Sequence, residues 1–248
     1  MNKILGYVFT PFHYLAFGLF LCIFHPIQWL SFKLGGVKAH KKSVDLLNFF
    51  LVSTYYLLGC RIKFINNQQL PENRPIIFIA NHQSMYDIAP LIWFLRKYHA
   101  KFISKIELIK GIPSISFNLK YGGGANIDRK DSKRAVAEIL KLGQRMQANN
   151  WSAVIFPEGT RSRDGQLKPF AVGGIATLLK KAPNSLIVPI TIKNSWKLVQ
   201  YGTFPLSFGE KISFTVLQPI EPAGRPAEAI IAEAEIAIRK DLNQLITL

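Results

Sequence analysis

The chain has 248 residues, 49% of them apolar, enough for one large domain with a sizeable core, or one domain with a small accessory element. The 31 Lys and Arg outnumber the 15 Asp and Glu and give a formal net charge of +16, which favours nucleic acid or an anionic membrane surface as partner. Aromatic and aliphatic residues crowd into roughly the first sixty positions and do not interleave with the basic ones, so the composition argues against nucleic acid and favours a membrane.

The N-terminal segment, residues 1–60, contains two uncharged apolar runs. The first, residues 4–32, exceeds the roughly 20 residues that a helix needs to cross a bilayer, whereas the second, residues 46–60, is short for a span. Basic residues flank both runs, and the positive-inside rule places every flank on the cytoplasmic side. The flanking residues are Lys3, Lys33, Lys38, Lys41, Lys42, Arg61 and Lys63. We therefore predict a two-helix hairpin that dips into one leaflet. The alternatives are a single span by the first run and two helices of a soluble core; a cleaved signal peptide is disfavoured.

The two cysteines suggest no chemistry of their own. Cys22 and Cys60 lie in these apolar segments, and neither belongs to a metal-ligand spacing. We therefore expect buried, reduced thiols, no metal site and a domain suited to the cytosol.

Beyond residue 60 the chain alternates between strand-like apolar runs and helical patterns. This alternation predicts an α/β domain over residues 61–248, with a mixed, largely parallel sheet flanked by helices and preceded by the membrane-associating element of residues 1–60. The expected strands are 76–80, 101–104, 153–156, 186–191 and 211–217. The expected helices are 87–98, 131–148, 172–181 and 226–245, the last with an apolar stripe of Ile231, Ala234, Ile238, Leu242 and Leu245.

A histidine and an aspartate follow the first of these buried strands. His82 and Asp87 lie in Asn81-His82-Gln83-Ser84-Met85-Tyr86-Asp87, where α/β proteins place their sites. A neutral imidazole can remove a proton from an alcohol, and a carboxylate can fix its tautomer. Ser84 is a candidate N-cap that would turn Asp87 back toward the loop. A capping or packing role for His82 is the alternative.

Two further segments carry arginine in turns expected at the same edge. Glu158, Gly159, Thr160 and Arg161 follow the strand 153–156, and the guanidinium of Arg161 suits a phosphate. Glu158 can orient that arginine or accept a bond from a substrate hydroxyl. The alternative is a surface turn with solvated charges.

The other segment begins with Gly122-Gly123-Gly124 and ends at Arg129, without the pattern of a nucleotide-binding loop. Lys105 adds a cation just after the strand 101–104, although a plain surface lysine fits equally well. A base, two arginine turns and a membrane-seeking N-terminus suit an amphiphilic substrate with an alcohol and a phosphate. No nucleophilic Ser or Cys motif is found, so the histidine is expected to activate the substrate hydroxyl without an acyl-enzyme.

Four segments together resemble, in order, the blocks of the glycerolipid acyltransferase family. They are Asn81-His82 with Asp87, Gly123 to Arg129, Phe156 to Ser162, and Val188-Pro189-Ile190. The resemblance covers roughly residues 61–220 and is greatest to the bacterial 1-acyl-sn-glycerol-3-phosphate acyltransferases. Ala125 and Asn126 depart from it, because the family usually carries bulky apolar residues there.

The resemblance implies a membrane-bound enzyme on the cytoplasmic face of the bacterial inner membrane. His82, supported by Asp87, would deprotonate the sn-2 hydroxyl of lysophosphatidic acid. That oxygen would attack the thioester of acyl-carrier protein or acyl-CoA, with no cofactor. Lys105, Arg129, Glu158, Gly159, Thr160 and Arg161 would bind the phosphate and glycerol parts. Lysophospholipid, glycerol-3-phosphate and lyso-ornithine lipid are alternative acceptors, and a non-catalytic lipid-binding protein is the remaining alternative.

Overall fold

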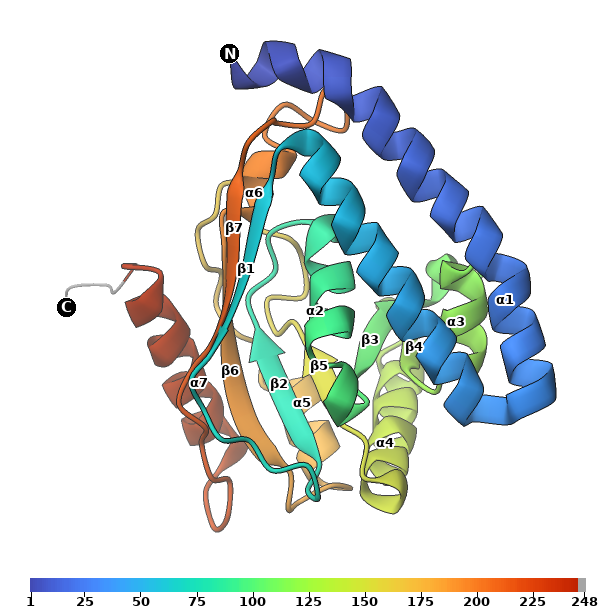
Figure 1. Ribbon diagram of the computed structural model, residues 1–248. Helices are drawn as coiled ribbons and strands as arrows, with labels where there is room; N and C mark the ends of the chain where they lie inside the picture. Colours follow the sequence, from blue (N-terminus) through green and yellow to red (C-terminus); the bar gives the residue numbers. More distant parts are fainter. Residues whose placement is uncertain (245–248) are drawn as a thin grey trace.

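The computed structural model describes residues 1–244 and is built around a seven-stranded sheet (Figure 1). The strand order is β1-β7-β6-β2-β5-β3-β4. The strands are β1 (Arg61–Asn66), β2 (Ile76–Ala80), β3 (Lys101–Lys105), β4 (Ala125–Ile127), β5 (Ala153–Ile155), β6 (Leu186–Lys193) and β7 (Lys211–Val216). The α-helices are α1 (Asn2–Ser53), α2 (Ile88–Phe94), α3 (Ile115–Tyr121), α4 (Ser132–Asn149), α5 (Gly173–Leu179), α6 (Ser195–Leu198) and α7 (Ala227–Asp241).

The sheet is mixed and largely parallel, as predicted. β6, β2, β5, β3 and β4 are parallel neighbours, whereas β7 is antiparallel to β6 and parallel to β1. The central strand β2 is fully buried, since helices cover both faces of the sheet. Its alternate residues enter two cores: Ile76 and Phe78 pack in one, Ile77 and Ile79 in the other. This burial explains why the strand was recognisable as a continuous apolar run.

The predicted strands and helices are present, with differences at their ends. The predicted helix 87–98 is too long, because α2 ends at Phe94 and a 3₁₀ turn, Arg96–Tyr98, leads to His99 in the left-handed conformation. The predicted helix 226–245 is also too long at its end, since α7 stops at Asp241. Position 245, which was placed in its apolar stripe, lies outside the described residues. The sequence patterns do not predict β1, β4, α3 or α6.

The N-terminal element is one helix, not the predicted two. α1 runs from Asn2 to Ser53, and only Gly36 leaves helical geometry, with φ 62° and ψ −156°. The positive φ suits glycine, and the chain turns back there without an intervening loop (Figure 1). Pro11 and Pro26 lie inside the helix. The two apolar runs therefore form two arms of one kinked helix, which packs against α2 and α3.

The first arm of α1, before the kink at Gly36, exposes a continuous apolar face, unlike a typical helix of a soluble protein. Its outer face carries large apolar side chains three or four positions apart: Ile4, Val8, Phe12, Leu15, Leu19, Ile23, Ile27, Leu30 and Leu34. Its inner face buries the polar residues Thr10, His13 and Gln28 together with the apolar residues Leu21 and Phe24. Within the described residues, Asn2–Leu58 is the one helix long and apolar enough to cross a membrane. An apolar face turned outward indicates association with a membrane.

One cysteine prediction needs correction. Cys22 is exposed on α1 and Cys60 is buried, and both are free thiols. Cys22 lies on an apolar run, but that run presents part of its surface outward, so apolar sequence there does not imply burial.

Candidate active site

The predicted site residues follow neighbouring parallel strands, so they gather at one edge of the sheet. His82 comes shortly after β2, the turn with Glu158 and Arg161 shortly after β5, Lys105 ends β3, and Arg129 comes shortly after β4. Because β2, β5, β3 and β4 are adjacent and parallel, their carboxyl ends share an edge.

His82 and Asp87 form a direct pair. The imidazole Nδ1 lies 2.8 Å from Asp87 Oδ2, and the exposed fractions of the two side chains are 13% and 0%. Ser84 caps the short 3₁₀ helix Met85–Asp87 in a capping box, as predicted, which turns the carboxylate back toward the loop. With Nδ1–H assigned toward the carboxylate, Nε2 presents a lone pair that can accept a proton.

Donors surround the Asp87 carboxylate on both oxygens. Oδ2 accepts from the main-chain N–H groups of Gln83 at 2.7 Å and Ser84 at 3.0 Å. Oδ1 accepts from the hydroxyls of Ser84 and Ser195. A carboxylate is an acceptor on both oxygens, so each of these donors finds an acceptor. Sequence reasoning missed Ser195, because it lies at the start of α6 and no local pattern links it to Asp87.

Neighbouring residues hold the His82 ring and main chain in place. The ring stacks on Phe156, with centroids 4.1 Å apart and an interplanar angle of 17°. The His82 N–H donates to Glu158 Oε1 at 2.7 Å, and the His82 carbonyl accepts from the Ser162 N–H at 2.7 Å. Hydrogen bonds to the main chain of His82 therefore hold the turn after β5 against the histidine loop.

Glu158 bridges two loops in this structure. Its Oε2 accepts from the Lys168 N–H at 3.0 Å, while Oε1 holds His82. Burial raises the pKa of the Glu158 carboxyl, which these main-chain bonds partly oppose. Its oxygens are thus engaged with main-chain amides, and its predicted contact with substrate remains a prediction.

The rest of the turn is open to solvent. Gly159 has φ 67°, and Gly159, Thr160 and Arg161 are exposed. The Lys168 ammonium, not predicted from sequence, donates to Thr160 Oγ1 at 2.9 Å and to the Arg161 carbonyl at 2.8 Å. The turn therefore offers a guanidinium and an ammonium beside the edge that carries His82.

The two cations from β3 and β4 are also exposed. Lys105 pairs in register with Ile127, and Arg129 follows that residue closely. The departures from the family pattern have structural roles: Ala125 is fully buried, and the Asn126 amide donates to the Leu119 carbonyl at 2.7 Å, at the end of α3. Both side chains are therefore engaged in the fold.

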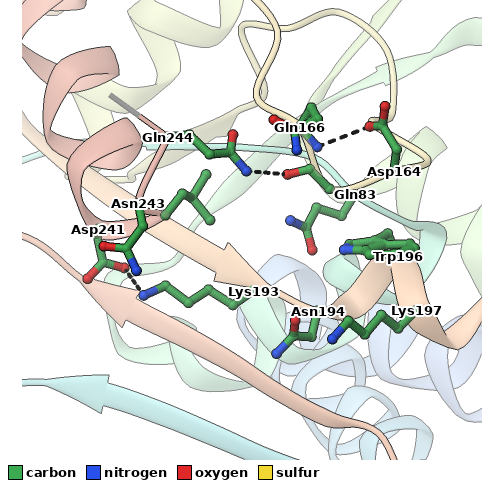
Figure 2. Close-up of a pocket in the computed structure, with 12 residues that line it drawn as sticks. Gln83, Asp164, Gln166, Lys193, Asn194, Trp196, Lys197, Asp241, Asn243 and Gln244 are labelled. Atoms are coloured by element: carbon green, nitrogen blue, oxygen red, sulfur yellow. Dashed lines mark hydrogen bonds and ion pairs between the residues drawn. The ribbon is translucent and has the colours of Figure 1, made fainter. Parts of the chain in front are cut away.

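A separate pocket of about 280 Å³ lies beside the pair (Figure 2). Gln83 lines it, and its Oε1 accepts from the Ser195 N–H at 3.0 Å, so one residue links the pocket to the Asp87 shell. Lys193 and Asp241 form an ion pair of 2.9 Å in its wall (Figure 2). His82 does not line this pocket. Across residues 1–244, no group of three or more His, Cys, Asp and Glu is arranged to hold a metal ion.

Comparisons with known proteins identify the family. Residues 61–193 match the model of the acyltransferase family. A chloroplastic 1-acyl-sn-glycerol-3-phosphate acyltransferase of Brassica napus is 30% identical over 77% of this chain and 53% of its own length. The human 1-acyl-sn-glycerol-3-phosphate acyltransferase beta is 33% identical over 53% of this chain and 47% of its own. The chain thus spans about half the length of the curated relatives it matches.

A solved structure shares the fold over almost the whole chain. It is the crystal structure of the 1-acyl-sn-glycerophosphate (LPA) acyltransferase of Thermotoga maritima. The TM-score is 0.81 at 22% identity, and the match covers 98% of this chain and 97% of the other. The family match includes β1 to β6 with His82, Asp87 and the arginine turns. The chain therefore belongs to the acyltransferase family.

Proposed function

We propose that this enzyme transfers a fatty acyl group from acyl-carrier protein or acyl-CoA to the sn-2 hydroxyl of lysophosphatidic acid, giving phosphatidic acid. The observation that carries the proposal is the His82–Asp87 pair, with Nδ1 held at 2.8 Å and Nε2 left to act. The curated relatives above are named for 1-acyl-sn-glycerol-3-phosphate, which supports this acceptor.

The chemistry needs one base and an oriented substrate. His82 Nε2 takes the proton of the sn-2 hydroxyl as that oxygen attacks the thioester carbonyl carbon. The C–S bond then breaks, an ester is formed, and the departing sulfur takes the proton back from the imidazolium. Asp87 stabilises the transient positive charge, and the Ser195 hydroxyl helps hold that carboxylate in place.

Cations at the same edge suit the acceptor's phosphate. Arg161 and Arg129 offer planar donor forks and Lys105 a point charge, with Gly159 and Thr160 supplying main-chain and hydroxyl groups in the turn. Lys168 joins this set through its contacts with Thr160 and Arg161. An acceptor with a phosphate monoester is therefore favoured over lyso-ornithine lipid, which lacks phosphate. Glycerol-3-phosphate and other lysophospholipids keep a phosphate and remain alternatives.

The first arm of α1 supports a position on one leaflet of the bacterial inner membrane, with the catalytic residues on the cytoplasmic side. Polar contacts fasten this arm to the body of the protein: His13 Nδ1 to the Thr54 carbonyl at 3.1 Å, the Ser114 hydroxyl to the Leu21 carbonyl at 2.6 Å, and the Ser114 N–H to His25 Nδ1 at 3.0 Å. Because these contacts hold the first arm of α1 against the body of the protein, we expect this arm to lie along the membrane surface and not to span the bilayer. A cysteine introduced at Asn2 should react from the cytoplasm; reaction from the periplasm would favour the single-span alternative.

The proposal is tested with purified full-length protein, one acyl thioester and a panel of lyso acceptors, with mass detection of the products. Phosphatidic acid should form fastest from lysophosphatidic acid, and free thiol should appear only when an acceptor is added. Preference for another acceptor would keep the acyltransferase but replace the substrate. Binding of lysophosphatidic acid without thiol release would favour the non-catalytic alternative.

A further inference from the structure

A second basic cluster lies around Trp151, at the amino end of β3, away from the edge that carries His82. We call it the Trp151 cluster; it comprises His99, Lys101 and Arg145, together with His40 and Lys41, which interact electrostatically with Lys101. The Lys101 ammonium lies 4.4 Å from the centroid of the Trp151 ring, and the His99 ring lies 4.8 Å from it. Arg145 donates to the Gly124 carbonyl at 3.1 Å, which brings the glycine-rich segment to the same place.

Several nitrogen atoms of the cluster are buried without a hydrogen-bond partner. They are His40 Nε2, His99 Nε2 and Arg145 Nε. His40 is 1% exposed and Lys101 is 9% exposed. The ion pairs found within residues 1–244 do not include Lys101. Buried polar groups in native proteins are usually paired, so these atoms call for a ligand.

The cluster is short of negative charge. Asp45 is the acid beside it, and Lys41 already binds that carboxylate and the Arg96 carbonyl. Burial, followed by repulsion from Lys41, lowers the pKa of the Lys101 ammonium to about 7. Burial and the charge of Lys101 lower the pKa of His99 to about 3. Within residues 1–244 the cluster therefore holds more basic groups than the single acid Asp45 can pair.

We propose that the Trp151 cluster binds a phosphate-type anion, with Lys101 and Arg145 as the charged donors and the imidazole of His99 completing the site. Phosphate oxygens accept several N–H bonds at once and match both an ammonium and a guanidinium. Trp151, His99 and Arg145 are only half-buried, so the cluster extends to the surface of the protein.

The position in the fold suggests two sources for the anion. His40 and Lys41 follow the turn of α1 at Gly36, where the exposed apolar stripe ends at Leu34. A phospholipid headgroup could reach the cluster from a membrane under that stripe, and a free phosphate could reach it from solvent. The chemistry is the same in both cases, and the experiment separates them.

The test measures thermal unfolding of the full chain in an uncharged detergent. Inorganic phosphate is compared with chloride at equal ionic strength, and dihexanoyl phosphatidylglycerol with dihexanoyl phosphatidylcholine. At a hundredfold excess over the dissociation constant, the bound anion should raise the melting temperature by ~5–10 °C. Lys101→Met should remove most of this rise, whereas the matched control Lys97→Met, at an exposed lysine, should keep it. Arg145→Gln provides a second variant in case Lys101→Met folds poorly.

Phosphate can also bind the arginine turn, so the titration is repeated in Arg161→Gln. A rise that survives Arg161→Gln and is lost in Lys101→Met supports the site. If inorganic phosphate produces it, the source is free phosphate; if only phosphatidylglycerol does, the source is a headgroup. A rise that is lost in Arg161→Gln but kept in Lys101→Met, or no anion-specific rise at all, overturns the proposal whether or not the enzyme uses lysophosphatidic acid.

Discussion

His82 and His99 are both half-buried histidines packed against an aromatic ring, yet their surroundings differ in one decisive group. His82 stacks on Phe156 and has a carboxylate 2.8 Å from Nδ1. His99 packs against Trp151 in a tilted arrangement, is close to the cations Lys101 and Lys41, and its Nε2 has no hydrogen-bond partner. In the proposed mechanism the carboxylate makes His82 an oriented base at one edge of the sheet, whereas burial and the nearby cations lower the pKa of His99, so that it is neutral, with a spare donor or acceptor, at the other end of β3. The same side chain therefore has different chemical properties at the two sites, because its neighbouring groups differ.

The largest effect on the catalytic rate is expected from removing the carboxylate that distinguishes His82 from His99. Asp87→Asn should lower kcat by ~10²–10⁴, because an amide cannot stabilise the imidazolium and presents an NH₂ group to surrounding donors. Steady-state kinetics at saturating lysophosphatidic acid measure the loss, and near-ultraviolet circular dichroism checks the fold. Activity within threefold of the unmodified enzyme would show that His82 does not need its partner.

A smaller effect is expected from Ser195, which we regard as a positioning residue. Its hydroxyl donates to Asp87 Oδ1 from the start of α6, and the side chain is fully buried. A hydrogen bond to a charged group is worth about 1.5–3 kcal/mol, so Ser195→Ala should lower kcat by roughly tenfold or more, with KM little changed. Ser195→Thr keeps the hydroxyl and should recover part of the rate. Equal rates for the two variants would leave Ser195 with a packing role only.

The buried Lys101 of the Trp151 cluster predicts that the stability of the protein depends on pH. The pKa of Lys101 is about 7 in the folded protein and ordinary in the unfolded chain, so above pH 7 the unfolded state binds more protons. The free energy of unfolding should therefore rise from about pH 7 toward pH 10, by at most about 1.4 kcal/mol per pH unit, in phosphate-free buffer. Urea unfolding should show a flatter curve for Lys101→Met, which lacks the penalty present below pH 7. Parallel curves for both proteins would mean that Lys101 is not buried as a cation.

Much of the active-site edge could be predicted from sequence, because its signals are local. β2 is a continuous apolar run, and a histidine, a serine cap and an aspartate follow it within a few positions. The order of the parallel strands then places the turns that carry Arg129 and Arg161 at the same edge.

The remaining features depend on contacts between distant residues. Ser195 reaches Asp87 only through the pairing of β6 with β2. β1 is stabilised by β7, far along the chain, and its half-exposed pattern carries no strong apolar signal. The Trp151 cluster draws residues from α1, β3 and α4, and the charge spacing within each segment is that of an ordinary surface.

The central claim is that His82 is the base for a lipid hydroxyl. It is tested most directly by measuring thiol release from acyl-CoA on addition of lysophosphatidic acid, for the unmodified enzyme and for His82→Ala. We expect a fall of ~10²–10⁴ in the acceptor-dependent rate of His82→Ala, with the melting temperature and binding to anionic vesicles preserved. A His82→Ala enzyme that is folded, membrane-bound and nearly as fast as the unmodified one would contradict it.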